Sequence, residues 1–171
     1  MPIEPGWEIS KDRMKDYNYF RARHFDPLES PILTTTMKKV ARVGIAKQYG
    51  EGFAVLTDKK FYFRKEASPG KAALEVIYIT PIDNPEWEDK IPLQQIVGIA
   101  YLGSGKYFLR WMKVDKQGTP KVDKHGNYKT NEAEFHVVRN KGEVKFKCLE
   151  RREQFGYFLQ EAINSLKGKS D

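Results

Sequence analysis

The end of the sequence carries the pattern that most constrains the fold. Large apolar residues recur there at the spacing i, i+3, i+4, i+7, i+8 and i+11: Phe155, Phe158, Leu159, Ala162, Ile163 and Leu166. This spacing predicts an amphipathic helix over about residues 150–166, with Gly168 as its stop. The polar side has no excess of Lys or Arg, so the pattern favours a helix that covers a hydrophobic core over one that lies on a membrane surface.

The chain before this helix alternates apolar and polar residues with the period of two that is typical of β-strands. The pattern starts at about Lys38, and turns such as Gly103-Ser104-Gly105 interrupt it. We expect strands at residues 40–47, 53–57, 60–64, 74–79, 91–102 (bent near 94–95), 107–114, 133–139 and 143–148. Residues 81–90 and 115–131 are polar and are expected to form loops. The sequence therefore predicts a mainly β protein, in which an antiparallel sheet of about seven strands is capped by the C-terminal helix.

Residues 1–37 differ in pattern and are expected to form an N-terminal extension ahead of a domain at 38–168. Ser10 is a candidate cap for a short helix that ends at about His24. Met14, Tyr17 and Phe20 are the side chains that would pack this helix on the domain. Pro27 and Pro31 follow it, and proline cannot continue a helix.

Three stretches have a recognisable order and spacing. Residues 52–63 read GFAVLTDKKFYF, residues 91–99 read IPLQQIVGI, and Glu153-Gln154-Phe155 leads into the final helix. Together they resemble the hairpin, strand and closing helix of GRAM and bacterial PH domains, which belong to the pleckstrin-homology-like (PH-like) superfamily. The resemblance covers roughly residues 38–167. It implies a partly open antiparallel barrel plugged by the helix, and it implies a binding module, although PH-like folds serve many partners.

Composition bears on where the protein acts. The chain has 171 residues and a single cysteine, Cys148, so no disulfide can form within it. A reducing compartment is therefore favoured. The first residues lack the apolar core of a signal peptide, and no stretch is long and apolar enough for a membrane span. We expect a cytoplasmic protein that can also lie at the membrane periphery, and the oligomeric state stays open.

The charge is uneven along the chain. The net charge is +7, and basic residues dominate two blocks, 38–80 and 104–149, which flank an acidic segment at 81–103. Such blocks favour anionic partners such as phospholipid headgroups or nucleic acid. A merely solubilising surface would have the same composition.

The candidate anion or headgroup site consists of Lys47, Lys59, Lys60 and Arg64, because several cations must converge on phosphate groups. Nucleic-acid binding would instead need aromatic side chains among cations on an exposed face. Tyr62, between Lys60 and Arg64, and Tyr107, near Lys106 and Arg110, are the candidates for that role.

No spacing of His, Cys, Ser or acidic residues matches a catalytic or metal-binding motif. We therefore expect no metal and no cofactor, and a non-enzymatic binding module. Its partner is expected to be a protein or an anionic phospholipid surface. Two alternatives stay open: a nucleic-acid-binding protein that uses the two basic blocks, and a small-ligand-binding barrel or enzyme.

Overall fold

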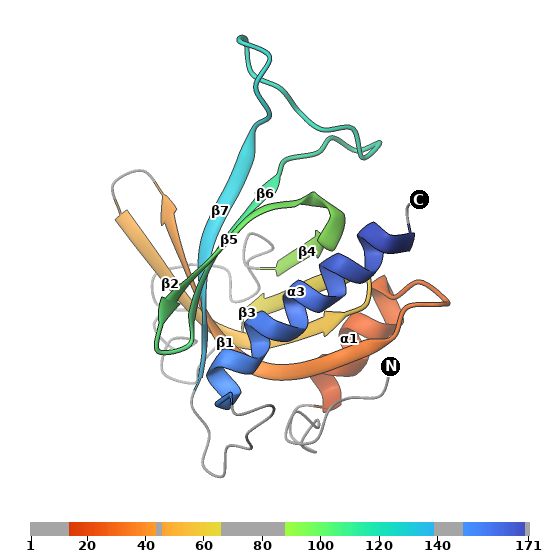
Figure 1. The fold of residues 1–171 in the computed structure, drawn as a ribbon, viewed down its shortest axis with the longest axis vertical. Helices are drawn as coiled ribbons and strands as arrows, with labels where there is room; N and C mark the ends of the chain where they lie inside the picture. Colours follow the sequence, from red (N-terminus) through yellow and green to blue (C-terminus); the bar gives the residue numbers. More distant parts are fainter. Residues whose placement is uncertain (1–13, 44–45, 66–87, 139–148, 170–171) are drawn as a thin grey trace, which may run out of the picture.

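A single antiparallel sheet organises the molecule. The computed structural model describes residues 14–43, 46–65, 88–138 and 149–169. Its strands are β1 (Pro31–Val43), β2 (Ala46–Thr57), β3 (Lys60–Lys65), β4 (Glu88–Pro92), β5 (Ile96–Gly103), β6 (Lys106–Met112) and β7 (Thr130–Val137). They lie in the order β4-β3-β2-β1-β7-β6-β5. The sheet curls without closing, and the helix α3 (Arg151–Lys169) lies across its open side (Figure 1). The expected class is confirmed: a mainly β, PH-like, partly open barrel with a C-terminal helix.

Strand β1 joins the two halves of this sheet. It pairs with β2 along its whole length, from Pro31↔Thr57 to Val43↔Ala46. On its other side it pairs with β7 over the short stretch from Met37↔Val137 to Val40↔Glu134. Every strand of the β4–β3–β2 half is therefore connected to the β7–β6–β5 half through the backbone of β1.

The apolar stripe of α3 fills the space inside the curled sheet, as the sequence predicts. Five residues of the stripe are buried, and Leu166 packs partly buried against them. Aromatic side chains from the strands meet them: Phe61 packs edge-on against Phe155, and Tyr107 does the same from β6. Gly168 does not end the helix, which continues to Lys169.

The outer face of β2 and β3 is covered by the helix α1 (Met14–His24). Tyr17 and Phe20 are buried there against Phe53, Val55 and Tyr62. The end of the helix at His24 is as expected, but Met14 is exposed rather than packed on the sheet. Ser10, the expected cap, lies outside the described residues. Because α1 covers one face and the core covers the other, three consecutive residues of β3, Phe61 to Phe63, are all fully buried.

A buried carboxylate fixes the chain between α1 and β1. Oε2 of Glu29 accepts hydrogen bonds from Thr57 Oγ1 at 2.6 Å and from the Tyr62 hydroxyl at 2.7 Å. Thr57 Oγ1 in turn accepts from the backbone N–H groups of Lys59 and Lys60, which closes the β2–β3 turn. Burial, followed by the hydrogen bond to Glu29, raises the pKa of the Tyr62 hydroxyl, so it stays a donor.

Two strands begin where the sequence predicted other structure. β1 begins at Pro31 rather than at about Lys38, because Ile32, Leu33, Thr34 and Thr35 already lie buried in the sheet. The strand therefore runs through the expected boundary at residues 37 and 38. β4 begins at Glu88, inside the expected loop 81–90, because its charged residues pair with β3.

The expected single strand at 40–47 is wrong: β1 ends at Val43 and β2 begins at Ala46, which pairs back with Val43. The expected bend at residues 94–95 is confirmed as the short 3-10 turn η3 (Leu93–Gln95) between β4 and β5. The expected strands at 74–79 and 143–148, together with Cys148, lie outside the described residues.

A close contact between α3 and β6 depends on a glycine. A Cβ atom on Gly156 would lie 2.5 Å from Cε1 of Tyr107. The hydroxyl of Tyr107 donates to the carbonyl of Arg152 one turn earlier in the helix. Burial raises the pKa of that hydroxyl and keeps it a donor. Tyr107 is therefore held between the helix backbone and the core, with no room for a larger residue at 156.

We expect Gly156→Ala to lower the free energy of unfolding by about 1–3 kcal/mol, because the Tyr107 ring must move within a packed core. Gly168→Ala is the matched control in the same helix, since a Cβ there meets nothing within 4 Å. Alanine favours a helix over glycine, so the control should leave stability unchanged or raise it by up to about 1 kcal/mol. Urea unfolding measures both. Equal stabilities of the two variants would contradict the assigned contact.

Candidate functional site

The structure does not gather the four predicted anion-site cations at one point. Lys59 and Lys60 lie together at the turn between β2 and β3. Arg64 lies near the other end of β3. Lys47 lies near the start of β2, in register with Arg42, and its side chain is outside the described residues. Only Lys59 and Lys60 are therefore neighbours.

Two of these cations are engaged within the protein. The guanidinium of Arg64 lies 3.9 Å from the centre of the Tyr19 ring, on which Arg23 also stacks at 4.2 Å. Nζ of Lys59 lies 3.8 Å from a carboxylate oxygen of Asp26. A phosphate group bound here would have to compete with these contacts.

The prediction that Tyr62 and Tyr107 stack on nucleic-acid bases is wrong. Tyr62 has no exposed surface and Tyr107 is almost fully buried. Neither ring can stack on a base, because α1 covers Tyr62 and α3 covers Tyr107.

The carboxylate of Glu88, at the start of β4, ties α1 to the sheet. It accepts a hydrogen bond from the Tyr19 hydroxyl at 2.7 Å, and Nε2 of His24 lies 3.0 Å from its other oxygen. Burial alone would raise the pKa of Glu88, but the contacts with Tyr19 and His24 outweigh it and hold the pKa below its ordinary value. These contacts hold α1 on the sheet.

A stronger candidate is the outer edge of β5, where the sheet ends within the described part of the chain. Its eight residues, IVGIAYLG, include no charged side chain. Val97 is 53% exposed and Leu102 is 51% exposed. The sequence shows residues 96–103 as an apolar run, but only the strand order shows that this run lies at an edge of the sheet.

A groove runs between this strand and the start of α3. Its volume is about 410 Å³, and it is lined by Ile99, Tyr101, Tyr107, Leu149, Glu153, Gly156 and Tyr157. The ring of Tyr101 stacks on that of Tyr107, with centroids 4.9 Å apart, and Tyr101 accepts a hydrogen bond from the Gly105 N–H. The walls are thus aromatic and already held in place, with one carboxylate, Glu153, among them.

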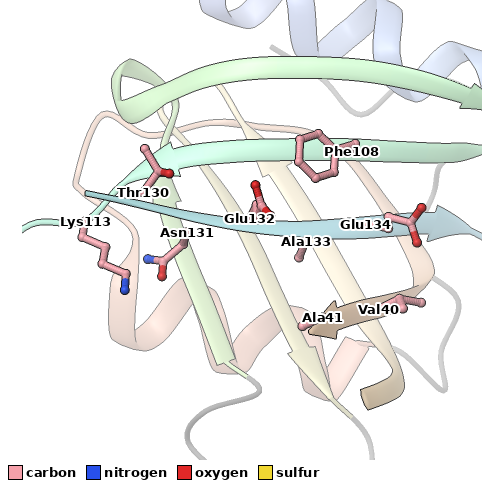
Figure 2. A pocket seen from close by; sticks show the side chains of 9 residues that line it. All are labelled: Val40, Ala41, Phe108, Lys113, Thr130, Asn131, Glu132, Ala133 and Glu134. Atoms are coloured by element: carbon pink, nitrogen blue, oxygen red, sulfur yellow. The ribbon is translucent and has the colours of Figure 1, made fainter. Parts of the chain in front are cut away.

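A second hollow, of about 530 Å³, lies where β1 separates from β7. Figure 2 shows Val40 and Ala41 of β1 beside the first residues of β7, from Thr130 to Glu134. Its polar side chains include Lys113, and Glu132 is paired with Arg110 at 3.2 Å. Acidic, basic and apolar side chains are mixed here, and their arrangement points to no ligand class.

Neither a metal centre nor a membrane span is found among the residues described. No group of three or more His, Cys, Asp or Glu side chains there could hold a metal ion. No helix within the same ranges is long and apolar enough to cross a bilayer.

No protein-family model matches the chain, and no curated protein matches it. The PH-like description therefore rests on the strand order and the closing helix.

The contacts of Glu88 predict how the stability of the fold depends on pH. Because its pKa is lower in the folded protein, this carboxylate stabilises the fold above its ordinary pKa of 4.5, and the contribution is lost as the pH falls through the lowered value. We expect Glu88→Gln to be less stable than the parent at pH 7, and the difference to shrink between about pH 5 and pH 3. Burial raises the pKa of the neighbouring Asp89, and the charge of Glu88 adds to that rise, so Glu88→Gln also lowers the pKa of Asp89.

Chemical unfolding across this pH range measures the effect. Glu51→Gln removes one exposed carboxylate from β2 and is the control for loss of charge. A stability difference between Glu88→Gln and the parent that is the same at pH 7 and pH 3 would show that Glu88 does not act through its charge.

Proposed function

We propose that this protein is a non-enzymatic binding module of the PH-like type, and that it binds an extended segment of a partner protein along β5. The observation that carries the proposal is the contrast between the two edge strands of the described sheet. β4 has the sequence EDKIP, with three charged residues, whereas β5 has none among eight. Natural sheets protect their edges with charge, and an edge without it is open to pairing with another chain.

The groove beside β5 supplies what such a partner needs beyond backbone pairing. In strand addition, main-chain hydrogen bonds give affinity and pockets for alternate side chains give specificity. Tyr101 and Tyr157 offer an aromatic surface for one apolar side chain of the added segment. Glu153 in the same groove favours a basic or hydroxyl-bearing residue next to it.

The register of β5 indicates how long the added segment is. The pairing with β6 is irregular between Ile96 and Gly98 and again between Tyr101 and Gly103. Bulges turn side chains out of the regular pleat, and the two most exposed large apolar residues of β5, Val97 and Leu102, lie at these positions. The regular stretch from Gly98 to Tyr101 would pair with the partner segment, and Val97 and Leu102 would contact that segment at either end.

Binding to an anionic membrane surface through Lys47, Lys59, Lys60 and Arg64 stays a prediction, as do the cytoplasmic location and a peripheral membrane position. Binding to a membrane surface has less support than binding to a protein partner. Arg64 stacks on Tyr19, Lys59 lies near Asp26, and the four cations are spread over the length of two strands.

The test is selection of peptides from a displayed random library, followed by affinity measurement with the purified protein. We expect the selected peptides to have one large apolar residue and to shift the amide resonances of β5 and of the first turns of α3. Val97→Lys and Leu102→Lys should each weaken binding by at least about tenfold, because an unpaired ammonium group would have to lose its water.

Leu28→Lys is the matched control. Leu28 is 81% exposed and lies between α1 and β1, so the same change should leave peptide affinity unaltered. The proposal fails if no peptide is selected, or if the control weakens binding as much as the β5 variants do.

A further inference from the structure

The connection between β6 and β7 has an ordered structure of its own. Residues 113–120 read KVDKQGTP and residues 121–128 read KVDKHGNY, so an eight-residue unit occurs twice before Lys129. Each unit forms a tight turn closed by a single bridge, Val114↔Pro120 in the first and Val122↔Tyr128 in the second. We call residues 113–129 the double turn. Figure 1 shows it as the teal segment that extends beyond β6 and β7, away from the barrel and both helices.

Three lysine backbones join the two units. The N–H of Lys113 donates to the carbonyl of Lys129, that of Lys129 to Lys121, and that of Lys121 to Lys113, each at 2.9 Å. These bonds form a closed ring, which brings residues eight positions apart in sequence to one point. The double turn therefore has a defined shape without a hydrophobic core.

The only acidic side chains of the double turn are used inside it. Oδ1 of Asp115 accepts from the backbone N–H groups of Gln117 and Thr119, both at 2.9 Å. Oδ1 of Asp123 accepts in the same way from His125 and Asn127. Gly118 and Gly126 follow with φ of +84° and +81°, a conformation that favours glycine. Each aspartate thus shapes its turn and has its carboxylate directed at backbone amides.

The basic side chains, by contrast, are exposed. The double turn has five lysines, Lys113, Lys116, Lys121, Lys124 and Lys129, against two aspartates. All five are exposed, and none forms an ion pair with another residue within the described ranges. The result is a projecting basic surface on a preformed backbone.

One apolar pair lies among these lysines. Tyr128 is 62% exposed and its bridge partner Val122 is 52% exposed, whereas the corresponding Val114 and Pro120 of the first unit are half-buried. The pair lies at the base of the second turn, beside Lys121 and Lys129. The tips of both turns, by contrast, are polar: Lys116-Gln117-Gly118 and Lys124-His125-Gly126.

We propose that the double turn binds single-stranded nucleic acid, with its lysines on the phosphates and the ring of Tyr128 stacked on a base. Cations that follow the backbone and an exposed aromatic ring are the two components of such sites. A bilayer fits less well, because the polar tips would enter the headgroups before the apolar pair at the base. The ring of hydrogen bonds fixes the lysine backbones before binding, which lowers the ordering cost of association.

The chemistry of the site also limits its specificity. The double turn has no arginine, and a lysine ammonium contacts phosphate as a point charge without the paired geometry that reads a base edge. Stacking on tyrosine accepts any base. We therefore expect binding that depends on strand charge and flexibility and little on sequence.

The test is the fluorescence anisotropy of labelled oligo(dT) with the full chain over a range of salt concentrations. The affinity should fall steeply with salt, with a slope of log K against log salt of about −3.5, since each of the five lysines on a single-strand phosphate adds about −0.7. The double variant Lys121→Gln/Lys124→Gln should reduce the slope by about 1.4. Tyr128→Ser should weaken binding about five- to hundredfold and leave the slope unchanged.

The control for charge is Lys90→Gln/Lys167→Gln, which removes two exposed lysines from β4 and α3. It should leave the slope as in the parent. Because every altered side chain is exposed, urea unfolding should give the parent stability for each variant and so exclude misfolding.

Three results would overturn the proposal. One is the absence of oligo(dT) binding at low salt. The second is an equal loss of affinity in the control and in Lys121→Gln/Lys124→Gln. The third is lysine-dependent binding to phosphatidylserine vesicles without binding to oligo(dT), which would assign the double turn to a membrane surface. The selected β5 peptides should bind Lys121→Gln/Lys124→Gln as they bind the parent, so this test is independent of the β5 site.

Discussion

The whole architecture depends on the backbone pairing of β1 with two neighbours. The contact with β7 is short, from Met37 to Val40, yet it is the only strand pairing in the described sheet that joins the β2 side to the β6 side. The packing of α3 depends on the same pairing of β1 with β7, because α3 packs on Phe61 from one side and on Tyr107 from the other. Without this pairing the sheet would separate into two halves, and neither half alone would enclose the apolar stripe of α3.

This arrangement places the groove beside β5 and the double turn at opposite ends of β6. Tyr107, beside the groove, lies near the first residue of that strand, and Lys113 directly follows its last residue. The peptide site is apolar and bounded by α3, whereas the double turn is basic and projects from the sheet. β5 runs antiparallel to β6 and pairs Ile96 with Trp111, so the Val97 end of the peptide site lies on the side of the double turn.

The sequence predicts best where one local period decides the structure. The spacing from Phe155 to Ile163 identifies α3, because a helix buries residues three and four apart. Tyr62 shows the opposite case: its neighbours Phe61 and Phe63 face the core, so alternation assigns it to solvent, and only the packing of α1 buries it. β4 was missed for a similar reason, since its charged residues match a loop until they are paired with β3. The β5 edge is an apolar run in the sequence, but its place at the end of the sheet is a property of topology.

The double turn lies between these cases. Its polar composition predicts only a loop at 115–131, although Asp and Gly stand at the same positions of both units, as turns require. The ring of hydrogen bonds is not visible, because it joins three separate positions. The ring brings three of the lysines close together, and like charges at short range repel. Salt screens this repulsion over about 8 Å at physiological ionic strength, but it does not remove it. A polyanion would neutralise these charges without moving the backbone, and this favours binding.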